Sequence, residues 1–144
     1  MTMSVRISRV RDGISLPQYQ TDGAAGFDLA AAETVAVAPG AVALIPTGLV
    51  IAVPPGCFLG VFARSSTPLK RGLMVANGVG VVDEDYSGPT DEIKIQVLNF
   101  TSVPVVVQAG DRLAQGVILQ YVRATWQEEP ATGPARGGFG STGR

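Results

Sequence analysis

An acidic cluster follows a short apolar run near the middle of the chain, and its residue types could do proton chemistry. The run Val79 to Val82 is β-branched and bracketed by glycines, which predicts a brief strand or hairpin arm. Asp83, Glu84 and Asp85 come directly after it, followed by Tyr86. A carboxylate held where a buried strand ends can still reach solvent, as a general base requires. Asp83 is the candidate base, and the alternative interpretation is an acidic, solvated turn.

The composition limits the chemistry that is open to the chain. There is no histidine, which removes Ser-His and Cys-His nucleophiles and the usual zinc sites. Carboxylates, arginines, hydroxyls and backbone amides remain, and Mg²⁺ is the metal that suits them best. The single Cys57 cannot form an internal disulfide, and the start of the chain carries no apolar signal region, so we expect a cytoplasmic protein.

The charge pattern also excludes some partners. The net charge is -1 and no basic face is evident, so we expect no nucleic-acid polymer as a partner. No run reaches the roughly 18 apolar residues that a membrane span needs, so we expect no membrane partner. A small anion can still bind, because a few placed arginines are enough to hold it.

One segment predicts a short helix beside such an anion site. After Arg64 to Ser66 the sequence offers Thr67 as the N-cap, Pro68 as the first helical residue and Gly72 past the end. A helix starting there would point free amides and the positive end of its dipole toward an anion. The alternative is a capped turn that links two strands.

The rest of the body indicates a β fold that positions these groups. Glycine (18) and proline (10) recur between short apolar runs every eight to twelve positions, which is typical of a sandwich or barrel. The length of 144 residues fits one domain. Ile93, Ile95 and Val97 alternate with polar residues and predict a half-buried strand. The other expected strands cover 4–10, 23–29, 34–37, 42–45, 49–53, 57–63, 103–107 and 113–122.

The composition changes toward the C-terminus. Residues 130–144 contain glycines and prolines but no aliphatic side chain larger than alanine, so they cannot build a core. We therefore expect a β-rich body at 1–129 and a flexible glycine-rich arm at 130–144. The arm also holds Arg136, Phe139, Ser141 and Thr142, which combine a charge, a stacking ring and hydroxyls suited to wrapping a nucleotide. The alternative is a disordered end.

Five stretches, taken in order, resemble the trimeric dUTPase family, whose members hydrolyse dUTP to dUMP and pyrophosphate. They are AGFDL at 25–29, ARSS at 63–66, NGVGVVDEDYSG at 77–88, GDRLAQ at 110–115 and GGFGSTG at 137–143. The resemblance covers essentially the whole chain. It implies a jelly-roll-like (β-clip) all-β domain, Mg²⁺ as cofactor and a homotrimer with exchanged C-terminal arms. The implied function is Mg-dependent hydrolysis of dUTP, which removes dUTP from the nucleotide pool and supplies dUMP for dTMP synthesis.

The resemblance also implies a role for individual residues. Asp83 would activate the water that attacks the α-phosphorus, and Asp28 would meet Mg²⁺ through its water shell. Tyr86 would pack on the sugar and exclude a 2′-hydroxyl, unless it is a core tyrosine. The phosphates would be contacted by Arg64, Ser65, Ser66 and Gln115. The uracil edge would be met by Asn77 and by main-chain groups of Gly78 and Val82. The arm would contribute Arg136, Phe139, Gly140, Ser141 and Thr142.

Three details qualify this assignment of roles. The family usually has its last-motif arginine where this chain has Pro134, so the phosphate role of Arg136 depends on a shifted position. The run Pro89-Thr90-Asp91 lengthens a turn beside the sugar pocket. Asp111 and Arg112 are expected to be structural, as an ion-paired turn into a strand.

Two other functions remain open. One is that of the related dCTP deaminases, which the Asn77 to Asp83 segment, the Phe139 tail and the missing histidine argue against. The other is a non-catalytic β-rich module with a regulatory or structural role. A pure binder would not need Asp28, Arg64, Asp83 and Gln115 together.

Overall fold

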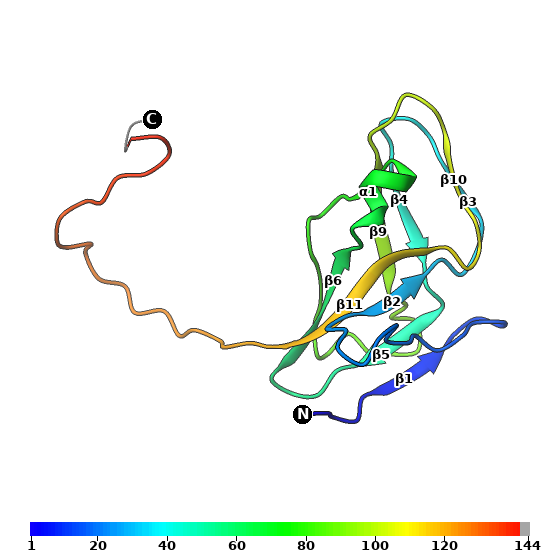
Figure 1. The fold of residues 1–144 in the computed structure, drawn as a ribbon. Helices are drawn as coiled ribbons and strands as arrows, with labels where there is room; N and C mark the ends of the chain where they lie inside the picture. The colour runs from blue at the N-terminus through cyan, green and yellow to red at the C-terminus, as the bar shows by residue number, and fades with distance from the viewer. Residues whose placement is uncertain (142–144) are drawn as a thin grey trace.

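Eleven short strands and one helix make up the body of the chain in the computed structural model, which describes residues 1–141 (Figure 1). The strands are β1 (Arg6–Arg9), β2 (Phe27–Ala30), β3 (Val35–Val37), β4 (Val42–Pro46), β5 (Leu49–Ala52), β6 (Cys57–Ala63), β7 (Leu73–Val75), β8 (Gly80–Val82), β9 (Lys94–Asn99), β10 (Val105–Val107) and β11 (Arg112–Gln120), and the helix is α1 (Ser66–Arg71). The expected all-β fold with one short helix is confirmed.

Two sheets carry most of the strands. A four-stranded sheet has the order β2-β11-β6-β8, and a three-stranded sheet has the order β4-β9-β7. The remaining strands form the pairs β1-β5 and β10-β3. Pairing is antiparallel in each case, and most partners are far apart in the sequence. This arrangement agrees with the expected jelly-roll-like architecture.

One hydrophobic core takes side chains from both sheets. Its fully buried members include Leu29, Leu59 and Leu113 from the four-stranded sheet and Ile45 and Ile95 from the three-stranded one. In β9 the buried Ile95 and Val97 alternate with the exposed Lys94, as the sequence predicts. Burying a side chain of this size contributes about 1.5–3 kcal/mol, so this core holds the sheet edges in place.

The helix α1 begins differently from the expectation. Its N-cap is Ser65, not Thr67, and its first turn has no capping side chain. Thr67 is fully buried, and its hydroxyl donates to the carbonyl of Leu113 on β11 at 2.6 Å. A buried carbonyl requires a donor, and this tertiary contact outweighs the local preference of threonine for a cap. Gly72 ends the helix with a φ of 68°, as predicted.

The segment between α1 and the acidic cluster holds two corrections. Leu73–Val75 forms β7, for which the sequence analysis expected no strand. Gly80–Val82 forms the expected short strand β8, but not as a hairpin arm, because β7 pairs with β9 whereas β8 pairs with β6. The turn at Asn77 and Gly78, where Gly78 has a φ of 72°, therefore carries the chain from one sheet to the other.

Beyond β11 the described chain, up to Ser141, contains no helix or strand and extends away from the body (Figure 1). Val122 and Trp126 in this extension are almost completely exposed. Among the described residues, regular structure thus ends at Gln120. None of the helical segments in residues 1–141 has the length and apolar character required to cross a membrane.

Candidate active site

Two arginines converge on one carboxylate at an edge of the four-stranded sheet. Arg64 Nε lies 2.9 Å from Asp28 Oδ1, and Arg112 Nη1 lies 3.0 Å from Asp28 Oδ2. The Asp28 side chain is only 13% exposed, so both of its oxygens are committed to these partners. Two guanidinium groups around one carboxylate leave a net positive site that can attract an anion, and Arg is well suited to phosphate geometry.

Strand register brings these residues together. Asp28 on β2 lies opposite Gln115 on β11, and Ala114 on β11 lies opposite Ala63, the last residue of β6. Arg64 follows Ala63 directly, and its Nη1 also donates to the carbonyl of Arg112 at 3.1 Å. Motifs that lie far apart in the sequence therefore form one cluster.

Gln115 is held beside this cluster by a close neighbour. Its Nε2 donates to the carbonyl of Ala63 at 3.1 Å. A Cβ built on Gly26 would lie 2.8 Å from Gln115 Oε1, so a side chain there would require the Gln115 amide to shift. Glycine at position 26 therefore leaves room for the amide in its observed position, where it bonds the Ala63 carbonyl.

The buried Thr67 sets the main chain at Arg64. Its hydroxyl accepts a hydrogen bond from the Arg64 amide at 3.2 Å while donating to Leu113. Ser65 and Ser66 lie between these two residues, at the start of α1. The hydroxyl thus connects the start of the helix to β11, and the position of Arg64 depends on it.

The acidic cluster is exposed and lies beside β6. Asp83 lines a pocket of about 500 Å³ together with Phe58, Tyr121 and Arg123. Glu84 in the same pocket accepts from the Gly56 amide at 2.7 Å and from the Tyr121 hydroxyl at 2.9 Å. The bonds from Gly56 and Tyr121 lower the pKa of Glu84, so it stays charged as the anchor of this loop.

Tyr86 is not a core residue, because its side chain is 41% exposed. Its hydroxyl donates to the carbonyl of Glu92 at 3.2 Å, and its amide donates to the carbonyl of Asp83 at 3.1 Å. The inserted Pro89-Thr90-Asp91 forms a closed turn, in which the Gly88 amide donates to Asp91 Oδ2 at 2.7 Å. Asn77 is exposed in its turn, and the Val82 side chain packs against the core, which leaves its main chain for other contacts.

A single chain keeps the acidic cluster and the arginine cluster apart. Val82 lies opposite Leu59 in the β6-β8 pair, which places Asp83 beside Phe58. The run from Phe58 to Arg64 spans about 20 Å at ~3.3 Å per residue. The candidate base and the candidate phosphate ligands therefore do not meet within one copy of the chain.

The arm residues lie apart from both clusters. Phe139 has a φ of 50° and a fully exposed ring. Ser141 closes a turn in which its amide donates to the Gly138 carbonyl at 3.0 Å and its Oγ accepts from the Gly138 amide at 2.6 Å. Arg136 and Gly140 are exposed. Thr142, also a predicted site residue, lies outside the described residues.

Three contributors were not predicted as site residues from the sequence. Arg112 belongs to the Asp28 cluster, whereas Asp111 pairs with Arg71 at 2.8 Å, so the expected ion-paired turn has partners elsewhere. Thr67 and Tyr121 act through hydrogen bonds that join distant segments. The Gly-Asp-Arg stretch was a signal for Arg112, but no local pattern marks the other two.

The donor set suits a magnesium ion that keeps most of its water. Within residues 1–141 no three His, Cys, Asp or Glu side chains gather to enclose a metal. Asp28 is one carboxylate at an anion-attracting cluster. Because Arg64 and Arg112 already pair with both Asp28 oxygens, Asp28 could meet Mg²⁺ only through the water shell of an ion that arrives with a phosphate ligand.

Comparison with known proteins identifies the family of the chain. Residues 12–143 match the family model described as dUTPase. A deoxyuridine 5′-triphosphate nucleotidohydrolase from Lactococcus lactis subsp. lactis is 44% identical over 134 residues, covering 91% of this chain and 89% of the relative.

Two solved structures show the same fold. The dUTPase from Streptococcus mutans has a TM-score of 0.78 at 37% identity and covers 83% of this chain and 98% of its own. The Staphylococcus bacteriophage 80alpha dUTPase with dUPNHPP has a TM-score of 0.84 and covers 99% of each chain. Because its identity is only 22%, it supports the assignment of the fold alone. Since the family model and the Lactococcus relative both span most of the sequence, the chain belongs to the dUTPase family.

Proposed function

We propose that the protein hydrolyses dUTP to dUMP and pyrophosphate. The observation that carries the proposal is the cluster of Arg64, Arg112 and Gln115 around Asp28, a site for an anion in a chain of the dUTPase family. Hydrolysis of dUTP would lower its level in the nucleotide pool and supply dUMP.

In the proposed reaction Asp83 removes a proton from a water molecule as the water oxygen attacks the α-phosphorus. A new O–P bond forms, the bond from the α-phosphorus to the α,β-bridging oxygen breaks, and pyrophosphate leaves with that bond's electron pair. Arg64, Ser65, Ser66 and Gln115 would hold the phosphate oxygens and stabilise charge that develops on them. Mg²⁺, held at Asp28 through water, would neutralise triphosphate charge.

The acidic loop would also select the nucleoside. Asn77 and the main chain of Gly78 and Val82 would hydrogen bond the uracil edge, which both donates and accepts. The Tyr86 ring would pack on the sugar and close the space of a 2′-hydroxyl. The exposure of Tyr86 and Asn77 supports this, because both are accessible to a ligand.

A homotrimer with exchanged arms is part of the proposal. The separation of about 20 Å between Asp83 and the arginine cluster supports a site that a second copy completes. Val42, Leu98 and Met74 lie in one row across β4, β9 and β7, and Val42 and Met74 are 55% and 49% exposed, so this row offers an apolar surface to another copy. Arg136, Phe139, Gly140, Ser141 and Thr142 would close over the nucleotide from another subunit's arm.

The test is pyrophosphate release from dUTP, dCTP, dTTP and UTP, each with Mg²⁺ and after chelation by EDTA. We expect release from dUTP alone, and a large loss on chelation. Deamination of dCTP would favour the deaminase function, and no turnover of any nucleotide would favour a non-catalytic module. A cytoplasmic location stays a prediction, supported by the single buried thiol of Cys57.

A further inference from the structure

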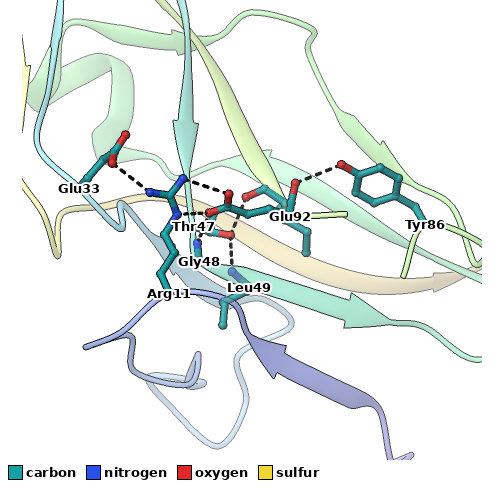
Figure 2. Close-up of polar contacts among 8 residues, drawn as sticks. Arg11, Glu33, Thr47, Gly48, Leu49, Tyr86 and Glu92 are labelled. Atoms are coloured by element: carbon teal, nitrogen blue, oxygen red, sulfur yellow. Dashed lines mark hydrogen bonds and ion pairs between the residues drawn. The ribbon is translucent and has the colours of Figure 1, made fainter. Parts of the chain in front are cut away.

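Arg11, which follows β1, joins three separate parts of the chain. Its Nη1 lies 3.0 Å from Glu33 Oε2, its Nε lies 2.7 Å from Glu92 Oε1, and its Nη2 donates to Glu92 Oε2 at 3.1 Å. Figure 2 shows the guanidinium between Glu33 on one side and Glu92 on the other. The contact with Glu92 is bidentate, a geometry that restricts both side chains more than a single ion pair would.

Glu92 is itself fixed from another direction. Its Oε1 accepts from the Gly48 amide at 2.8 Å in the turn between β4 and β5, and its side chain is only 11% exposed. Burial alone would raise the pKa of Glu92, but the bonds from Arg11 and Gly48 lower it, so the carboxylate is charged at neutral pH. The next residue, Ile93, is also anchored, since its carbonyl accepts from the Thr47 hydroxyl at 2.6 Å.

The carbonyl of Glu92 is the acceptor for the Tyr86 phenol (Figure 2). Between Tyr86 and Glu92 the chain makes the Gly88–Asp91 turn, closed by the Gly88 amide on Asp91 Oδ2 and by the Asp91 amide on the Gly88 carbonyl at 3.1 Å. The loop from Tyr86 to Glu92 is therefore closed by the hydrogen bond between the Tyr86 hydroxyl and the Glu92 carbonyl. Arg11 binds the side chain of that same glutamate.

We propose that Arg11 is a positioning residue for sugar selection: by holding Glu92 it fixes the carbonyl that orients the Tyr86 ring against a 2′-hydroxyl. This inference rests on the proposed function, in which Tyr86 faces the sugar. Arg11 has no contact with Asp28 or Arg64, and it acts only through the Glu92 carbonyl and the Tyr86 hydroxyl. Its loss should therefore change which sugar is accepted more than the rate of the chemical step.

The physical reason is the freedom of the loop. Tyr86 is held at its hydroxyl by one neutral hydrogen bond in a partly exposed position, and such a bond alone restrains the ring only weakly. When Arg11 is removed, the Glu92 side chain keeps only the bond from the Gly48 amide, so the lengthened loop can shift by a fraction of an ångström and the Tyr86 ring with it. A ribonucleotide would then fit, whereas a deoxynucleotide, which needs no extra room, would be affected less.

The experiment compares Arg11→Ala, Arg11→Lys and Tyr86→Phe, assayed with dUTP and UTP in the full-length protein. We expect Arg11→Ala to raise the ratio of kcat/KM for UTP to that for dUTP about five- to twentyfold, mainly through a lower KM for UTP. Lysine cannot make the bidentate contact, so Arg11→Lys should raise the ratio of kcat/KM for UTP to that for dUTP nearly as much as Arg11→Ala does. Arg9→Ala is the matched control, since Arg9 donates to the Ile14 carbonyl and not to Glu92.

The link through the phenol is tested by the double variant. Tyr86→Phe keeps the ring but removes the hydroxyl that reaches Glu92, so it should raise the same ratio, and adding Arg11→Ala to it should change the ratio little further. The inference would be overturned if the double variant raised the UTP/dUTP ratio by the product of the two single-variant effects. It would also be overturned if Arg11→Ala lowered only the Tm and left this ratio unchanged. If Arg11→Ala does not fold, Arg11→Lys and Tyr86→Phe give the same comparison. Absence of dUTP hydrolysis by the wild type would instead refute the proposed function, and the selectivity role with it.

Discussion

At the scale of single residues, the cluster around Asp28 leaves each side chain little freedom. Both Asp28 oxygens are paired, Arg64 also bonds the Arg112 carbonyl, and Gln115 bonds the Ala63 carbonyl. Side chains that are already ordered lose little conformational entropy when a ligand arrives. Changes at these positions should therefore alter binding and turnover more than folding.

Asp83→Asn tests the proposed base. The amide cannot remove a proton from water, so kcat should fall by roughly 10²- to 10⁴-fold while the Kd for dUTP stays close to that of the wild type. Single-turnover kinetics and calorimetric binding of a non-hydrolysable analogue measure the two effects. Asp22→Asn, at an exposed carboxylate in another turn, is the control. Near-native turnover in Asp83→Asn would remove Asp83 from the mechanism.

Gly26→Ala tests whether Gln115 must be held in place. The new Cβ would lie 2.8 Å from Gln115 Oε1, so the amide should leave the Ala63 carbonyl. We expect kcat/KM for dUTP to fall about tenfold, with Tm within a few degrees of the wild type. Gly23→Ala is a matched control, because a Cβ there meets no atom within 4 Å. Equal kinetics in the two variants would show that the position of Gln115 does not matter.

At the scale of elements, the start of α1 and the strand β11 are joined by one buried hydroxyl. The Thr67 hydroxyl accepts from the amide of Arg64 and donates to the carbonyl of Leu113. It therefore connects the residue that follows β6, the start of the helix and β11. Tertiary contact rather than helix capping explains why a threonine stands there.

Thr67→Val preserves the shape of the side chain but removes this bridge. The Leu113 carbonyl would lose its donor in a buried position, which should cost about 1–3 kcal/mol of unfolding free energy, measured by urea denaturation. KM for dUTP should also rise, because Arg64 loses its anchor. Thr132→Val on the exposed arm should change neither quantity. If the expected loss of unfolding free energy occurred and KM stayed unchanged, Thr67 would have no role in positioning the phosphate site.

At the scale of the whole molecule, the proposed site is divided among copies of the chain. The arginine cluster and the acidic loop lie at different ends of β6, and the arm projects with Val122, Trp126 and Phe139 exposed. An extension with so few contacts to its own body contributes little to the stability of that body. Its side chains become useful only against another surface.

Truncation after Glu129 tests the arm. Tm and oligomer size should stay nearly unchanged, while dUTP turnover should fall steeply, because Phe139 can no longer stack on the base, a contact worth about 1–3 kcal/mol. A large fall in Tm would show that the arm supports the fold.

Mixing the truncated chain with Asp83→Asn tests whether sites are shared. Mixed trimers would contain sites with an intact Asp83 from one chain and an intact arm from the other, so partial activity should return. Mixed oligomers that form but stay inactive would contradict the exchanged-arm arrangement.

The fold class and most strands could be predicted from the sequence, because alternation and the Gly and Pro turns are local signals. β6 was predicted with its observed bounds, and Ile93, Ile95 and Val97 are buried as expected. The motifs also pointed to Asp28, Arg64 and Gln115, which the strand register places side by side. β7 was missed because three residues after a helix carry too little periodicity to mark a strand.

Which distant residues come into contact could not be predicted from the sequence and depends on the folded chain. The pairing of β11 with both β2 and β6 brings Arg112 to Asp28, the buried carbonyl of Leu113 takes Thr67 away from capping, and Arg11 reaches Glu92 across 81 positions. These contacts depend on strand register and on the need of buried polar groups for partners, neither of which is a property of a local stretch of sequence. For the same reason the distance between Asp83 and Arg64 could not be read from their motifs.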